Sequence, residues 1–200
     1  MPLGQISGAA VLDACVLFRG MLTDFLLCLA EAGCFVPIWS DQIHAEWTRN
    51  LLPRPGMSID RIAYRRTMME RTFPSANVPA DAILIATVLA GCRTNNERKD
   101  AHIVATAMAA SAEIIVTGNV NDVLPVVSRV APEVLALTPD AFCMRLYRRN
   151  PTQFAAAAWL HRTSMTRPAF SPDGYLNLLR SNRLGLPRSA ELLRPHRLGL

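Results

Sequence analysis

The residues best suited to chemistry lie between Asp100 and Asp122. This stretch reads D-A-H-I-V-A-T-A-M-A-A-S-A-E-I-I-V-T-G-N-V-N-D, so one acid precedes an apolar segment and a second acid ends a polar turn. Carboxylate and carboxamide oxygens, here those of Asp100, Asn119 and Asp122, are the ligands that hard divalent cations prefer. The stretch therefore predicts an oxygen-lined cation site if further acids reach it. Taken alone, an Asp at a helix start is also an ordinary cap.

The elements that must position these residues can be predicted from periodicity. We expect Asn95–Lys99 to be a polar loop and Asp100 to open an amphipathic helix, because apolar residues follow at helical spacing. Ile114–Val116 is a β-branched run typical of a strand buried in a parallel sheet. Helix, strand and turn would bring Asp100 near residues 117–122 at the carboxyl edge of the sheet, where α/β proteins bind ligands.

The N-terminal part supplies another acid at the same edge. Ala9–Asp13 is a short apolar run ending in a carboxylate, and it predicts a first strand with Asp13 at its carboxyl end. The helix that should follow has apolar positions from Leu17 to Leu29 and is ended by Gly33. Residues 34–39 predict a short edge strand, because Pro37 cannot donate to a ladder.

A third acid, Glu46, lies on a predicted helix that Ser40 caps and that runs to Leu52. It borders an apolar stripe, where a carboxylate can face a cleft. The simpler interpretation of a lone Glu is a surface acid paired with Arg49 or Asn50. Farther along, Ser58 predicts a helix to about residue 73, residues 83–89 fit either a strand or a helix, and residues 134–137 predict a last strand.

The C-terminal part differs from the rest in charge. Residues 1–144 contain 11 basic and 14 acidic residues, whereas residues 145–200 contain ten arginines and two acids. Pro follows a capping-type residue or Leu at 139, 151, 172 and 187, which predicts four helix starts. We therefore expect a body over 1–144 and a basic helical extension over 145–200. Such an extension suits nucleic acid or an acidic protein, and equally a solvated surface.

Composition limits the class of protein. Half of the 200 residues are hydrophobic, enough for one sizeable core. The five cysteines form no C-x-x-C pair and no signal peptide precedes them, which points to a reducing cytoplasm. The longest apolar stretch, residues 21–38, contains two acids and a proline, which argues against a membrane span.

Four separated motifs now appear in order: V-L-D-A-C-V-L-F, W-S-D-Q-I-H-A-E-W-T-R-N-L, D-A-H-I-V-A-T-A-M-A and I-I-V-T-G-N-V-N-D. Together they resemble a PIN domain, and more narrowly the VapC-type toxins of bacterial toxin–antitoxin pairs. The resemblance implies an α/β fold with a parallel sheet flanked by helices, and RNA cleavage with Mg²⁺ or Mn²⁺. It assigns catalysis and metal binding to four acids and adds one amide as a metal ligand: Asp13, Glu46, Asp100, Asp122 and Asn119.

The sequence departs from this family at one point. Relatives often carry consecutive acids where this chain has Lys99 and Asp100, so the number of bound ions is open. His102 is kept, and we expect it to pack under the site rather than act as a base. The resemblance also implies an RNA substrate and a cognate antitoxin, and a homodimer is possible. It extends to residues 145–200, which resemble the C-terminal extension of one VapC branch. The alternatives are an inactive PIN-fold binding module and a nuclease acting on DNA or on particular nucleic-acid structures.

Overall fold

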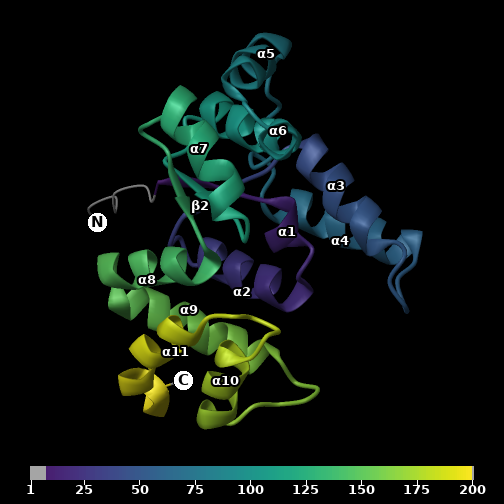
Figure 1. The fold of residues 1–200 in the computed structure, drawn as a ribbon. Coiled ribbons are helices and arrows are strands. Elements are labelled where there is room, and N and C mark those ends of the chain that lie inside the picture. The colour runs from purple at the N-terminus through teal and green to yellow at the C-terminus, as the bar shows by residue number, and fades with distance from the viewer. Residues whose placement is uncertain (1–7, 200) are drawn as a thin grey trace. The chain divides into compact units, whose positions relative to one another are not determined.

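The computed structural model describes residues 8–199, and its contacts group them into two compact units (Figure 1). The first, called here the sheet unit, consists of residues 8–18 and 36–137. The second, the helical unit, consists of residues 19–35 and 138–199. The helical unit thus combines a segment from the N-terminal part of the chain with the whole C-terminal part. The boundary at residue 144 that the sequence suggests stays a prediction.

The sheet unit is built on four parallel strands in the order β2-β1-β3-β4, which confirms the predicted α/β class. β1 and β3 are parallel neighbours, and Leu12 of β1 pairs with Val116 of β3. The residues that follow these two strands therefore lie side by side. β2 is an edge strand, as its proline predicts. The strand bounds are β1 Ala9–Leu12, β2 Val36–Ile38, β3 Ile114–Val116 and β4 Leu135–Leu137.

Six helices accompany the sheet in this unit, and α5, α6 and α7 lie beside one another (Figure 1). Ser40 and Ser58 accept hydrogen bonds from the backbone N–H groups three residues later, so both predicted caps are confirmed. The segment left open between strand and helix is helical, with Asp81 as its cap. The bounds are α1 Ala14–Leu17, α3 Asp41–Leu51, α4 Ile59–Thr72, α5 Ala82–Gly91, α6 Asn95–Ala109 and α7 Val120–Val130.

The prediction of a polar loop at Asn95–Lys99 is wrong. Those residues form the first turn of α6, so Asp100 lies inside the helix. The reason is a variant of the capping box: Thr94 accepts from the N–H of Glu97, and the Glu97 carboxylate reaches back to the N–H of Arg93, one residue before the cap. Glu97 also pairs with Arg129 of α7 at 2.6 Å, which ties the helix start to its neighbour.

Two further expectations need correction. The polar turn after β3 is shorter than expected, because α7 begins at Val120 and Asp122 lies in its first turn. The single helix expected after β1 is two, α1 and α2 (Gly20–Glu31), because Arg19 between them is extended. The end of α2 is as predicted, with Gly33 at a φ of +76° that suits glycine.

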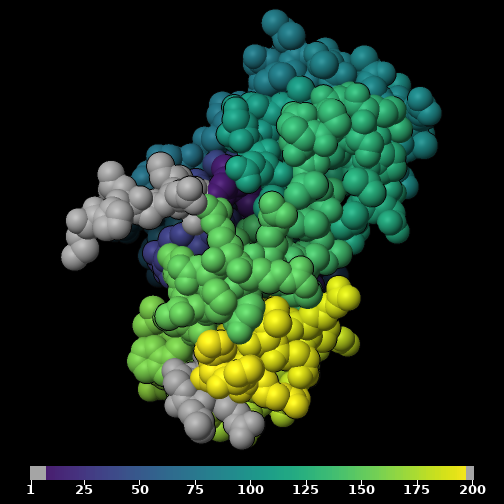
Figure 2. Space-filling model, turned by 90° about the vertical axis from the view of Figure 1, so that its left-hand side faces the viewer, coloured from purple at the N-terminus to yellow at the C-terminus, as the bar shows by residue number. Residues whose placement is uncertain are grey.

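The helical unit contains α2 and the predicted C-terminal helices, and Thr138, Asn150 and Ser171 cap three of them ahead of a proline. Phe25 of α2 meets Phe154 of α9 edge-on, with ring centroids 6.1 Å apart. Asp140 of α8 accepts from both N–H and O–H of Ser189 in α11, and Figure 2 shows these parts of the chain, green and yellow, in contact. The bounds are α8 Pro139–Arg149, α9 Pro151–Ser164, α10 Pro172–Arg180, α11 Pro187–Leu193 and a 3₁₀ helix, Arg194–Gly199.

All five cysteines are free thiols. None of the helices within residues 8–199 has both the length and the apolar character needed to cross a membrane.

Candidate active site

Asp13 stands at the carboxyl end of β1 and is only 3% exposed. Its Oδ2 accepts a hydrogen bond from the Thr117 hydroxyl at 2.6 Å and another from the Cys15 thiol at 2.8 Å. Thr117 follows β3 directly, so the pairing of β1 with β3 brings it to Asp13. Two side-chain donors therefore orient this carboxylate.

The loop after β3 fixes those donors in turn. The N–H of Gly118 donates to Cys15 Sγ at 3.1 Å, and the N–H of Asn119 donates to Thr117 Oγ1 at 2.9 Å. Burial, and next the negative charge of Asp13, raise the pKa of Cys15 to about 12. The thiol accordingly stays protonated and serves as a donor. Sequence reasoning missed Cys15, although a short polar side chain two residues after a strand-ending acid was a usable signal.

Glu46 of α3 faces His102 of α6 rather than its own helix neighbours. His102 donates from Nδ1 to the Lys99 carbonyl at 2.9 Å, which leaves Nε2 directed at the carboxylate, 3.4 Å from Oε2. No well-aligned hydrogen bond forms there, and the contact is an ion pair when His102 is protonated. It lowers the pKa of Glu46. Burial disfavours the imidazolium, but the Glu46 charge outweighs it and raises the pKa of His102.

The negative charges of the other three acids act together on the carboxyl group of Asp100. It is half-buried in α6, and its pKa is raised to about 6, first by burial and then by the negative charges of Asp13, Glu46 and Asp122. His102 opposes this shift in part. The structure therefore brings the four acids named from the sequence into one electrostatic group. Asn119 lies exposed at the start of α7 without capping it.

The fit of a metal to this group rests on charge and donor type. No three His, Cys, Asp or Glu side chains in the described part of the chain stand close enough together to form a ligand shell. The oxygen donors nevertheless suit Mg²⁺ or Mn²⁺, and the raised pKa of Asp100 reflects an excess of negative charge that a cation would neutralise. Asp13, Glu46, Asp100, Asn119 and Asp122 are accordingly candidate ligands, gathered by charge rather than arranged as a shell.

Two of these acids open onto a pocket. Glu46 and Asp100 share the walls of a cavity of about 490 Å³ that α3 and α6 border. The remaining side chains of its lining are polar, basic or small: Gln42, Ala45, Arg49, Lys99 and His102. The pocket thus places cations beside the acidic group.

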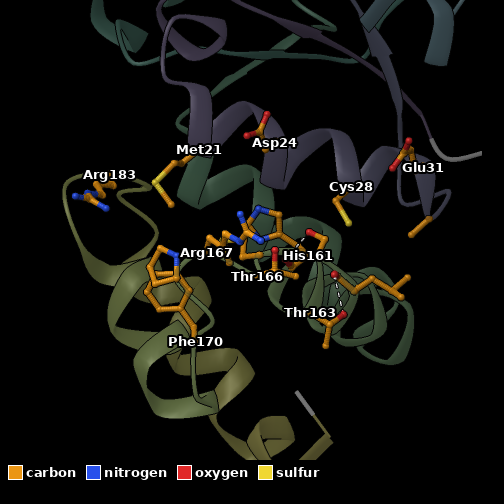
Figure 3. A pocket seen from close by; sticks show the side chains of 15 residues that line it. Met21, Asp24, Cys28, Glu31, His161, Thr163, Thr166, Arg167, Phe170 and Arg183 are labelled. Carbon is orange, nitrogen blue, oxygen red and sulfur yellow. Dashed lines mark hydrogen bonds between the residues drawn. The ribbon is translucent and has the colours of Figure 1, made fainter. Parts of the chain in front are cut away.

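A larger pocket, of about 1100 Å³, belongs to the helical unit (Figure 3). It is lined by α2, the end of α9 and the segment that follows, with Arg183 and Glu31 at opposite ends of the view. Its acids and arginines balance, and burial lowers the pKa of His161 in its wall to about 4. The four acids that act on one another gather around Asp100, which lines the smaller pocket, so the smaller pocket is the better candidate for catalysis.

Comparison with known families agrees with the motifs and with the sheet. Residues 9–121, more than half of the chain, match the family model described as PIN domain. Residues 139–195 match the model described as VapC50 C-terminal domain. Searches among curated proteins and solved structures gave no significant match. The chain therefore belongs to the PIN-domain family and is a VapC-type toxin of the nuclease class, with a VapC50-type C-terminal domain after its PIN domain.

Proposed function

We propose that this protein is a metal-dependent endoribonuclease, and that it is the toxin of a toxin–antitoxin pair whose antitoxin binds and inhibits it. Family membership supports the nuclease class. The observation that supports metal-dependent catalysis is the gathering of Asp13, Glu46 and Asp122 around Asp100, whose pKa is raised to about 6 first by burial and then by their negative charges. The five free thiols of the protein suit action in a reducing cytoplasm.

In this proposal the chain holds Mg²⁺ or Mn²⁺ through Asp13, Glu46, Asp100 and Asp122, and Asn119 adds a neutral oxygen. Such an ion, when bound, polarises a phosphate and lowers the pKa of a coordinated water. The protein's own part is orientation. Donors from Thr117 and Cys15 hold Asp13 by one oxygen. The Glu46 carboxylate is positioned by His102 of α6, whose ring nitrogen contacts it.

An inactive binding module is the weaker alternative. Like charges held near one another destabilise a fold, and they persist mainly where function needs them. A scaffold that only bound RNA would gain nothing from four acids at its binding edge, because they repel phosphate. All four acids are present here, together with the donors that orient Asp13.

The proposal is tested by offering purified protein a single-stranded RNA and a DNA of matched sequence, each labelled at one end. We expect cleavage of RNA with Mg²⁺ or Mn²⁺, no cleavage with EDTA, and loss of activity when the cognate antitoxin is added. Cleavage of DNA but not RNA would support the alternative nuclease, and metal-independent cleavage would contradict the assigned chemistry.

A further inference from the structure

Lys99 is the one lysine among the chain's 21 basic residues, all the others being arginine. It lines the 490 Å³ pocket beside the candidate active site and directly precedes Asp100. Its carbonyl accepts a hydrogen bond from His102, while its exposed side chain makes no hydrogen bond or ion pair with the side chains and backbone that the structure describes. A free cation thus stands next to a crowded acid.

Arg49 is a second cation in the same pocket. It follows Glu46 by three residues in α3, so the two side chains share a helix face, and its charge contributes to lowering the pKa of Glu46. Its exposed guanidinium likewise has no partner within the described residues. By contrast, Arg66 and Arg129 of the same unit are held by carboxylates.

The two cations fit an anion rather than the acids beside them. A nucleic acid must bring several phosphates to an edge that carries four carboxylates, and it needs local positive charge to do so. A lysine ammonium is a mobile point charge, and an arginine fork binds phosphate oxygens in pairs. Both lie next to the acids that would act on the scissile bond, so they suit a phosphate one nucleotide away from it.

We propose that Lys99 and Arg49 form a phosphate-binding subsite that holds a backbone phosphate of the substrate adjacent to the reacting one. This inference rests on the proposed function, because it needs a nucleic-acid substrate. It gives Lys99 a positioning role toward the substrate, in place of an effect on the number of bound ions.

Salt dependence of binding tests the subsite. Binding of a labelled single-stranded RNA is measured by fluorescence anisotropy at several salt concentrations, with every variant made in an Asp13→Asn background to prevent cleavage. Lys99→Met and Arg49→Met should each lower the slope of log affinity against log salt by about 0.7, and the pair by about 1.4. Arg98→Met is the matched control, since Arg98 is an exposed cation next to Lys99 in α6 that does not line the pocket.

The single lysine permits a second, independent measurement. An amine-acetylating reagent can modify only Lys99 and the N-terminal amine of this chain. Saturating RNA should slow acetylation of Lys99 several-fold relative to the N-terminal amine, as followed by mass spectrometry of peptides. Equal reactivity with and without RNA would overturn the subsite, as would an Arg98→Met effect as large as that of Lys99→Met.

Kinetics separate this inference from the function on which it rests. In the cleaving protein, Lys99→Met should raise the KM for RNA and leave the Mg²⁺ concentration for half-maximal rate unchanged. A lower Mg²⁺ requirement with unchanged RNA affinity would place Lys99 on the metal and overturn the subsite alone. Cleavage that survives Asp13→Asn would overturn the catalytic assignment alone, and absence of binding to RNA and DNA alike would overturn both.

Discussion

The substitution Asp100→Asn should stabilise the metal-free protein. The pKa of Asp100 is about 6 against an ordinary 3.8, a difference of roughly two pH units that corresponds to about 3 kcal/mol. Asp100 is partly exposed, and solvent screening should reduce the effect to about 1–2 kcal/mol. Because the folded state keeps this proton to a higher pH than the unfolded state, the free energy of unfolding should fall as pH rises from about 4 to about 6.

Thermal melting in EDTA measures the effect. At pH 7.5 we expect Asp100→Asn to melt about 2–8 °C above the wild type, and near pH 4 we expect most of the difference to be lost because Asp100 is then protonated in the folded protein. Glu133→Gln is the control, since it removes an exposed acid that is not among the charges acting on Asp100. Added Mg²⁺ should then stabilise the wild type more than Asp100→Asn, through binding to the folded state.

The reasoning is refuted if Asp100→Asn melts at or below the wild-type temperature at pH 7.5 in EDTA. The same holds if Glu133→Gln stabilises the protein as much, because the gain would then reflect net charge and not crowding at Asp100.

Two further predictions concern orientation and the basic C-terminal part. Thr117→Val removes a hydrogen-bond donor to the buried Asp13 carboxylate, so it should lower the cleavage rate more than tenfold and the free energy of unfolding by about 1–2 kcal/mol, whereas Thr117→Ser should keep both near wild type. Equal cleavage rates of the two variants, measured together with their thermal melts, would argue against an orienting role. Replacing the three exposed arginines of α8, Arg145, Arg148 and Arg149, by Gln should reduce the salt slope of RNA binding if this helix contacts RNA. If the helix contacts an acidic antitoxin instead, the same change should weaken inhibition by the antitoxin at unchanged RNA affinity. No change in either measurement would leave these arginines as solvated surface.

Periodicity and turn chemistry were enough to predict much of the sheet unit. The run Ala9–Leu12 and the β-branched Ile114–Val116 are strands as expected, because buried parallel strands are continuous apolar runs. Their pairing then places Asp13 beside Thr117, although 104 residues separate them. The cap residues Ser40 and Ser58 were equally readable, since each satisfies a backbone N–H in the first turn.

Other features were misread from the local pattern or could not be read from it. Asn95–Lys99 looks like a loop by composition, although the T-x-x-E pattern of Thr94 and Glu97 was a usable local signal for the helix start that places Asp100 within α6. The contact of Cys15 with Gly118 follows from strand register, which no local pattern specifies. The pairing of His102 with Glu46 likewise arises from the packing of α6 against α3.

The central claim is that a metal-dependent nuclease acts through the acidic group around Asp100, and the most direct test is RNA cleavage by Asp13→Asn. This substitution keeps the size of the side chain and an oxygen for its two donors while removing a negative charge from the group. We predict that the variant folds, melts at or above the wild-type temperature in EDTA, and cleaves RNA at less than about one-hundredth of the wild-type rate at any Mg²⁺ concentration. Full RNA cleavage by stringently purified Asp13→Asn would contradict the account.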